Sequence, residues 1–280
     1  MVHWQPDPIH QAFMKKTLDK AADHFNVTLV GQPVFGWRER TIGSKVISKQ
    51  GPRWLRVVSE MIQWAQGDWW EGNVAAGEIK GVARPRVLDT YEWEEKELRL
   101  RAELMTFVEG RICSPTRELR SKLDLPDDWW LQLRKSLDAL SAWKTDRISV
   151  EQETIARRFL VFYGDDIDPT ITEWTTAHGD LHWSNLVAPQ LSILDWEAWG
   201  RAPVGLDAAT LYCYSLLVPE MAERVYNTFA DILDTPDGMR TQLYVITHLL
   251  RRVDKGDYPD LAGPLHRHAR KLLTRLRRDI

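Results

Sequence analysis

Apolar and polar residues alternate in two different ways along the chain, and the change comes near residue 110. Between residues 27 and 108, runs rich in β-branched and aromatic residues are separated by glycine and proline, which is typical of strands and turns. Beyond this point apolar residues recur every three or four positions, which indicates helices. The pattern divides the chain into a strand-rich part, residues 1–110, and a mainly helical part, residues 111–280.

The strand-rich part is expected to begin with a helix over residues 8–24 and to contain a second helix over residues 68–80. Gln50-Gly51-Pro52 predicts a turn between two strands. The expected strands cover residues 27–30, 41–48, 53–59, 87–93 and 98–108.

The second part is expected to contain helices over residues 127–140 and 152–163 and beyond Gly205. Short strands are expected near residues 175–178, 185–187 and 191–194. In the last helix an apolar stripe lies opposite a basic face, so we expect the stripe to dock on the rest of this part, with the charges outward. A strand-rich lobe followed by a helix-rich lobe is an α+β arrangement.

Composition narrows the classes of protein. Lysine and arginine number 37 against 40 acidic residues, a net charge of −3, which argues against nucleic acid as the main partner. Apolar residues make up 44%, enough for a real core. Two cysteines 100 positions apart suit neither a disulfide framework nor a common zinc site. With no signal-peptide pattern and no membrane-spanning apolar run, a cytoplasmic location is the default expectation.

The strongest chemical signal is the run from His178 to Asn185, which reads His-Gly-Asp-Leu-His-Trp-Ser-Asn, followed by Asp195 at the end of an apolar strand. Phosphoryl transfer needs a carboxylate to orient the acceptor hydroxyl and hard oxygen ligands for Mg²⁺. Asp180 and Asn185 can divide these duties on one loop, and Asp195 can hold a second metal position. Each residue alone would suit an ordinary turn or helix cap, so the joint pattern carries the interpretation.

This pattern resembles the aminoglycoside phosphotransferases and the wider protein-kinase-like superfamily, with Ile-Leu-Asp-Trp-Glu in place of Asp-Phe-Gly. The resemblance implies a bilobal fold, ATP or GTP with Mg²⁺ as cofactors, and Asp180 as catalytic base. It also implies that Asn185 and Asp195 are magnesium ligands. His178 is expected to orient the loop, and Asp207 is expected to cap a helix and brace the loop.

The same resemblance implies a nucleotide site in the first part of the chain. A turn over the phosphates is expected between Gly36 and Ser44, including Gly43. Where the family usually has lysine on the third strand, this chain has Arg56. Arginine can bind phosphate with two hydrogen bonds, and Lys45 on the preceding strand is the alternative cation.

Two further parts of the nucleotide site follow from position in the family's pattern. Glu71 is the first choice for the acid that pairs with Arg56, and Glu78 is the second. Met105, Phe107 and Val108 end the last strand, where the family reads the purine edge with backbone groups and sandwiches the ring with apolar side chains.

The acceptor is less well specified. His182, Trp183, Glu197 and Trp199 lie close to the catalytic motifs and are candidates for substrate binding, although the tryptophans suit a core equally well. Acids outnumber bases only mildly between residues 219 and 261, so a polycationic aminoglycoside is compatible but not required.

We therefore expect an O-phosphotransferase acting on a hydroxyl of a small molecule, foremost an antibiotic, in resistance or self-protection. A kinase for choline, a sugar or an amino alcohol remains open, as does a catalytically inactive kinase-like binding protein. The segment between Asp195 and Gly205 is too short for an activation loop that would hold a peptide. Oligomeric state and the choice between ATP and GTP stay open.

Overall fold

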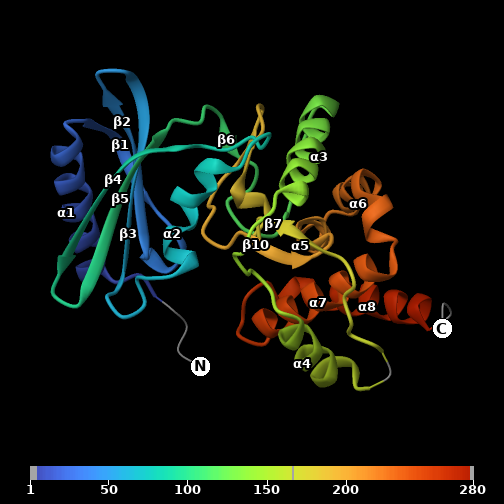
Figure 1. Cartoon of the computed structure of the whole chain (residues 1–280). Helices are drawn as coiled ribbons and strands as arrows, with labels where there is room; N and C mark the ends of the chain where they lie inside the picture. The colour runs from blue at the N-terminus through green and yellow to red at the C-terminus, as the bar shows by residue number, and fades with distance from the viewer. Residues whose placement is uncertain (1–4, 166, 278–280) are drawn as a thin grey trace. The chain divides into compact units, whose positions relative to one another are not determined.

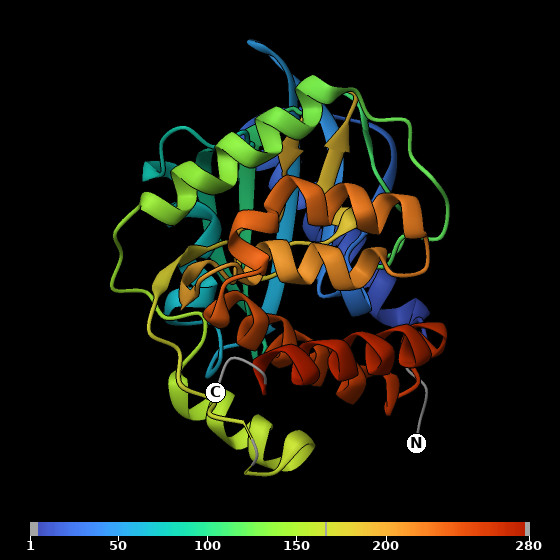
Figure 2. The same ribbon diagram turned by 90° about the vertical axis from the view of Figure 1, so that its right-hand side faces the viewer.

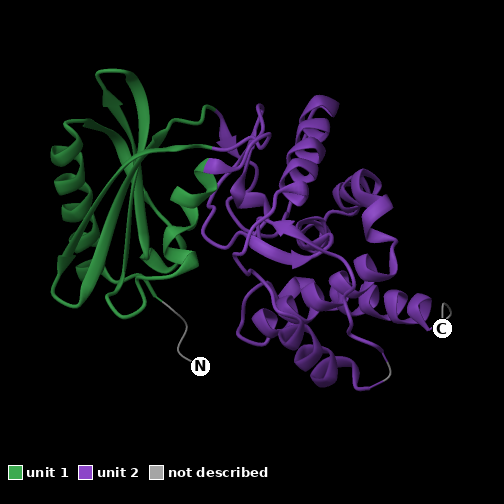
Figure 3. Cartoon of the chain, viewed as in Figure 1, with its two compact units in different colours: residues 1–77, 85–109 green, residues 78–84, 110–280 purple. Residues whose placement is uncertain are grey.

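The protein is described from a computed structural model that covers residues 5–165 and 167–277. It forms two compact units, and each is described separately below (Figure 3). The first contains the described residues up to 77 together with 85–109, and the second contains 78–84 and the described residues from 110 onward. Segment 78–84 joins the second unit because it bonds there: Ala83 O accepts from Ile193 N–H at 2.7 Å, and Ala83 N–H donates to Ser136 Oγ at 3.3 Å.

The first unit is built on a five-stranded antiparallel sheet in the order β1-β2-β3-β5-β4. The five expected strands are all present, and most extend beyond the expected bounds. Their bounds are Thr28–Phe35 for β1, Thr41–Ser48 for β2, Gly51–Met61 for β3, Val87–Glu95 for β4 and Leu98–Thr106 for β5.

Helix α1, Pro8–Phe25, covers one face of this sheet (Figure 1). Asp7 caps its first turn by accepting from Ile9 N–H at 2.9 Å. Met14 and Leu18 on the helix pack against strand residues such as Leu55 in one apolar core. The leading helix predicted over residues 8–24 is thus confirmed, and its apolar face closes the sheet's core.

Helix α2 is shorter than the predicted helix over residues 68–80. It runs over Asp68–Ala75 and tightens into a 3-10 turn at Ala76–Glu78. Gly77 lies in that turn, and glycine disfavours a continued α-helix because it loses much backbone freedom on ordering.

The second unit contains two small antiparallel sheets. Strands β6, Arg111–Ile112, β8, Leu186–Ala188, and β9, Ser192–Ile193, form one of them. In the other, β7, Trp174–Ala177, pairs with β10, Gly200–Pro203. Strand β10 was not predicted, because its Gly-Arg-Ala-Pro run lacks the alternation of apolar and polar residues that is typical of strands.

The rest of the second unit consists mainly of helices and the loops that connect them, as expected. Its helices are α3, Asp127–Ala142; α4, Gln152–Tyr163; α5, Leu206–Ser215; α6, Pro219–Leu233; α7, Pro236–Val253; and α8, Ala262–Leu276. Figures 1 and 2 show α8 lying along α7, and α5 contacts both α6 and α7. Leu265, Leu272 and Leu276 of α8 are buried, so the predicted docking stripe is confirmed. No helix within the described residues is long and apolar enough to cross a membrane.

Candidate active site

The loop from His178 to Asn185 follows directly from strand β7 and is fixed by Asp207 from the first turn of α5. The carboxylate of Asp207 accepts from His178 N–H at 2.7 Å and from Gly179 N–H at 3.0 Å. Gly179 has φ +83°, and a Cβ there would lie 2.5 Å from Ala198 O, so only glycine fits. Gly205, rather than Asp207, occupies the N-cap of α5. Asp207 therefore braces the loop through these two hydrogen bonds, as expected. It does not cap α5, contrary to the prediction.

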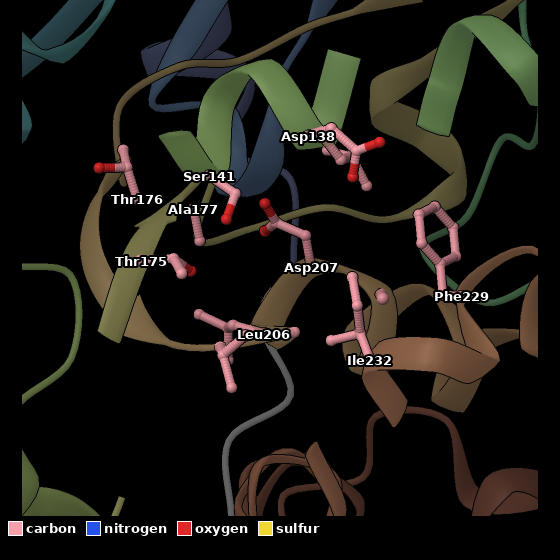
Figure 4. Close-up of a pocket in the computed structure, with 13 residues that line it drawn as sticks. Asp138, Ser141, Thr175, Thr176, Ala177, Leu206, Asp207, Phe229 and Ile232 are labelled. Carbon is pink, nitrogen blue, oxygen red and sulfur yellow. The ribbon is translucent and has the colours of Figure 1, made fainter. Parts of the chain in front are cut away.

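Asp207 also lines a small pocket (Figure 4). Asp207 and Leu206 line it from α5, Ala177 from β7, and Ser141 from α3. Asp180 and Asn185 are not among its lining residues, so this pocket belongs to the support of the loop rather than to the expected reaction site.

His178 links the two ends of the candidate site. Its ring is fully buried, Nε2 lies 2.9 Å from Leu194 O, and Nδ1 lies 3.3 Å from Asp180 N. Since Asp180 N–H donates to Nδ1, the proton sits on Nε2 and is donated to Leu194. Burial lowers the pKa of His178, which favours this neutral form. The histidine thus ties the backbone at Asp180 to the residue just before Asp195, as an orienting residue would.

Asp180 is held as an ionised carboxylate. Its Oδ1 accepts from Arg117 Nη1 at 2.6 Å, and its Oδ2 lies 3.5 Å from His182 Nε2. Partial burial opposes ionisation, but the contact with His182 and the charge of Arg117 outweigh it and keep the pKa of Asp180 well below its usual range. About a third of the side chain, 32%, remains exposed, so an acceptor hydroxyl can reach it.

Asn185 and Asp195 lie close together because the β8–β9 hairpin pairs their neighbours. Leu186 is the register partner of Ile193, and Leu194 N–H donates to Asn185 O at 2.8 Å. The side-chain Nδ2 of Asn185 donates to Asp180 O at 3.1 Å, and its Oδ1 makes no hydrogen bond within the described residues. Asp195 has φ +63°, a strained conformation for a residue other than glycine that is common at functional sites.

This donor set fits Mg²⁺. Magnesium prefers hard oxygen ligands, keeps several waters, and is commonly bound by one or two protein groups together with nucleotide phosphates. The Asn185 amide oxygen makes no hydrogen bond in the described chain, and the Asp195 carboxylate belongs to the residue after its hairpin neighbour Leu194, so the two could provide such groups. No cluster of three or more histidine, cysteine or acidic residues suited to a metal occurs in the described chain. The residues present therefore suit a metal that arrives with phosphate ligands rather than a fully protein-bound ion.

The residues expected to bind the acceptor are placed differently. Trp183 is fully buried, stacks on Trp129 with ring centroids 6.4 Å apart, and donates from Nε1 to Ser215 Oγ. Trp199 is 5% exposed and lies 4.4 Å from the guanidinium of Arg147. Both rings are packed in the core, so the core alternative is the one the packing supports.

The other two candidates, Glu197 and His182, differ from the tryptophans and from each other. Glu197 is half-buried, and its backbone O accepts from Arg147 Nη2 at 3.4 Å. His182 is buried, with its Nδ1 2.9 Å from the Ser184 hydroxyl and its Nε2 toward Asp180. Of the four candidates, only His182 contacts the expected base.

In the first unit, Arg56 is paired with an acid that the sequence did not suggest. Arg56 on β3 and Glu103 on β5 are register partners, and Arg56 Nη1 lies 3.0 Å from Glu103 Oε2. Glu103 is fully buried and also accepts from Asn73 Nδ2 at 3.0 Å and from Arg101 Nε at 3.1 Å. Glu71, the expected partner, instead lies 3.4 Å from Arg101 Nη1.

The expected phosphate turn is compact. Gly36 N–H donates to Thr41 O at 2.9 Å, and a Cβ on Gly36 would clash with Thr41 Oγ1. Gly43 and Ser44 lie within β2 rather than in the turn. Gly43 leaves room for the Trp54 ring, and the buried Ser44 hydroxyl bonds to Val30 O at 3.3 Å. Of the three residues assigned to the turn, only Gly36 lies there.

The alternative cation and the expected purine-binding residues meet at the end of β5. Lys45 Nζ lies 4.6 Å from the centre of the Phe107 ring. Met105 is buried in β5, whereas Phe107 and Val108 follow the strand and are half-buried. Lys45 is thus held near the segment expected to read the purine, and Arg56 is held in the middle of the sheet.

Known structures share this fold, although neither protein-family models nor curated protein sequences match the chain. The aminoglycoside phosphotransferase APH(4)-Ia is 12% identical, with a TM-score of 0.59 over 93% of this chain and 98% of that one. Spectinomycin phosphotransferase APH(9)-Ia, in complex with ADP and spectinomycin, gives 0.54 at 12% identity over 92% and 93%. Ethanolamine kinase from Plasmodium vivax gives 0.52 at 14% identity over 91% and 84%. The chain therefore has the protein-kinase-like fold of small-molecule kinases.

Proposed function

We propose that the chain is a nucleotide-dependent O-phosphotransferase that acts on a hydroxyl group of a small molecule. The observation that carries the proposal is the placement of three side chains on one hairpin and loop. Asp180 offers an ionised carboxylate, and Asn185 and Asp195 on the adjoining hairpin are proposed to offer oxygen ligands. The shared fold with small-molecule kinases supports the same reading.

In the proposed reaction Asp180 orients the acceptor hydroxyl and accepts its proton. The acceptor oxygen forms a bond to the γ-phosphorus of ATP or GTP while the bond from that phosphorus to the β,γ-bridging oxygen breaks, which releases the nucleoside diphosphate. Such transfer depends mainly on positioning and on neutralising charge. Mg²⁺, held by Asn185 and Asp195, would supply part of that neutralisation when bound with the nucleotide.

His178 contributes by fixing the loop. Its hydrogen bonds join Asp180 to Leu194, so the base and the metal-ligand segment keep a constant relationship. Arg56, kept in place by buried Glu103, is the proposed phosphate-binding cation, with Lys45 as the alternative. Gly36 in the first turn, and Met105, Phe107 and Val108 at the end of β5, are proposed to contact the nucleotide.

For the acceptor we propose first an antibiotic, because two of the structural neighbours were determined with hygromycin B and spectinomycin. The ethanolamine kinase among the neighbours keeps a small metabolite as the second class. The test is a panel of hydroxylated antibiotics and metabolites incubated with ATP or GTP and Mg²⁺, with omission of nucleotide as the control. The proposal expects a mass gain of one phosphoryl group on at least one compound. Tight nucleotide binding with no product from any compound would favour an inactive binding protein.

A further inference from the structure

Arg117 lies directly against the carboxylate proposed as the base, with Nη1 2.6 Å from Asp180 Oδ1. It comes from the irregular segment between β6 and α3, where the sequence analysis found no functional residue. We infer that Arg117 selects the acceptor by binding an anionic group, a carboxylate or phosphate, that lies close to the reacting hydroxyl. This inference rests on the proposed function and names the acceptor's chemical class.

The position of Arg117 is fixed from both sides. Its backbone O accepts from Trp183 N–H in the catalytic loop at 3.3 Å. Two residues on, Leu119 N–H donates to Tyr214 O in α5 at 2.9 Å. The backbone at Arg117 is therefore fixed to the catalytic loop and to α5, and the side chain extends from this fixed position to Asp180.

Only part of the guanidinium is occupied. Arginine carries five N–H donors in a planar fork. Nη1 is bonded to Asp180, whereas Nε and Nη2 make no hydrogen bond within residues 5–165 and 167–277. The side chain keeps 26% of its exposure, so these donors can reach a ligand. A carboxylate or phosphate oxygen is the group that completes such a fork.

Two further arginines, Arg158 and Arg252, lie within electrostatic range of His248, which is also within range of Asp180 and Arg117. His248 itself is neutral near pH 7, because burial and the nearby arginines lower its pKa to about 4. Arg158 has two buried nitrogens, Nε and Nη1, without a hydrogen-bond partner in the described chain. The Nε2 atom of His182 is likewise buried without a hydrogen bond, at 3.5 Å from Asp180.

Three acids of the neighbouring segments bind other arginines, although Glu118 keeps one buried oxygen, Oε2, without a hydrogen bond in the described chain. Asp257 lies 2.8 Å from Arg252, and Glu118 and Asp260 both bind Arg120. Within the described residues, Asp180 is the carboxylate that contacts Arg117. The guanidinium of Arg117 would attract an anionic group beside the reacting hydroxyl and repel an ammonium group there.

The aromatic side chains next to Arg117 form a wall for such an acceptor. Tyr214 and Tyr258 pack edge to face with ring centroids 5.5 Å apart, and although burial opposes it, Asp180 and both tyrosines raise the pKa of Arg117. Tyr258 is partly exposed. The acceptor is therefore expected to place an anionic end on Arg117 and its carbon skeleton along the Tyr258 ring.

The test uses three compounds that share a six-carbon polyol chain and differ in one terminal group: gluconate, sorbitol and glucamine. Their binding to the full chain with AMP-PNP and Mg²⁺ is measured by calorimetry. Arg120→Gln is the matched control, because Arg120 lies on the same segment but binds Glu118 and Asp260. We expect gluconate to bind about 10- to 100-fold tighter than sorbitol, the range that charge-assisted hydrogen bonds provide, and glucamine most weakly.

Arg117→Gln should abolish the advantage of gluconate, Arg117→Lys should keep part of it, and Arg120→Gln should leave it unchanged. Equal affinities for the three compounds, or a gluconate advantage that survives Arg117→Gln, would overturn the inference. So would a uniform loss of turnover by Arg117→Gln without any change in this ranking, since Arg117 would then act on Asp180 or on the transferred phosphoryl group.

The binding measurement requires no turnover, so it separates failure of the inference about Arg117 from failure of the proposed function. Preference for gluconate without phosphoryl transfer to any compound would contradict the proposed function and leave Arg117 as an anion-binding residue. Transfer to acceptors regardless of charge would contradict the role of Arg117 alone.

Discussion

Arg56 and Glu103 face each other across strands β3 and β5 as register partners, with Nη1 and Oε2 3.0 Å apart. The sheet itself therefore holds the cation that is proposed to bind phosphate. Glu103 is fully buried and shared with Arg101, whereas Glu71 on helix α2 has 56% of its side chain exposed. Strand pairing therefore brings Arg56 and Glu103 together, and helix α2 contributes through Asn73, whose Nδ2 donates to Glu103 at 3.0 Å.

Glu103→Gln is expected to destabilise the protein far more than Glu71→Gln. Removing one charge of a buried pair leaves its partners uncompensated and costs about 3–5 kcal/mol. An exposed ion pair contributes only about 0–1 kcal/mol. Urea unfolding of the two variants at neutral pH measures the difference. Similar free energies of unfolding would show that the Glu103 network does not stabilise the sheet.

Arg56→Ala is expected to raise the KM for nucleotide and to lower kcat, because it removes the proposed phosphate contact. Arg56→Lys should retain part of the activity if positive charge suffices and should fail if the planar fork is needed. Lys45→Ala provides the comparison, since Lys45 is held on the Phe107 ring. Kinetics in which Lys45→Ala is severely impaired and Arg56→Ala is unaffected would assign the cation to β2.

The architecture followed from the sequence wherever local patterns sufficed. The strands of the first unit have clear apolar runs between glycine and proline turns, and the amphipathic stripe of α8 determines which side is buried. Strand β10 could not be predicted, since Gly200 and Pro203 are poor strand formers and pairing with β7 alone makes the strand. Tertiary pairing overrode propensity there.

The contacts of the candidate site were harder to predict from the sequence than the fold. The motif around Asp180 and Asn185 has fixed spacing on one loop, so its residues could be named. Arg117 lies 63 positions before Asp180, and Glu103 lies 47 positions after Arg56. Both contacts depend on how distant segments are brought together. A local sign of the buried charged pair is that Arg101 and Glu103 are two positions apart in β5, so their side chains lie on the same face of the sheet.

Arg117→Gln is expected to raise the pKa of Asp180, because it removes a positive charge that favours the carboxylate. An acid whose pKa is lowered on folding adds stability above its unfolded pKa of about 3.9, and this stability is lost as pH falls through the lower folded pKa. The variant should therefore lose less stability than the wild type as pH falls below about 4.

The acidic limb of kcat/KM should also move to higher pH in Arg117→Gln, since Asp180 would be protonated more readily. Unfolding free energies and rates across acidic pH values measure both effects, with Arg120→Gln as the control. Identical pH profiles for Arg117→Gln and the wild type would mean that Arg117 does not control the ionisation of Asp180.

Asp195→Ala is expected to weaken binding of the Mg²⁺–nucleotide complex as well as the rate, because it removes a proposed metal ligand. Its affinity for nucleotide in EDTA should change much less. Titration of nucleotide with and without Mg²⁺ separates the two effects. A defect confined to the KM of the acceptor would contradict the metal-ligand role.

The central claim is that Asp180 is the base for phosphoryl transfer, and the most direct measurement is the rate of product formation by Asp180→Asn. With an acceptor found in the screen, the phosphorylated product is followed by mass spectrometry at saturating nucleotide. Asparagine keeps the shape of the side chain but cannot take the proton, so the rate should fall by about 10²–10⁴-fold while nucleotide affinity stays near that of the wild type. A variant that forms product at close to the wild-type rate would contradict the account.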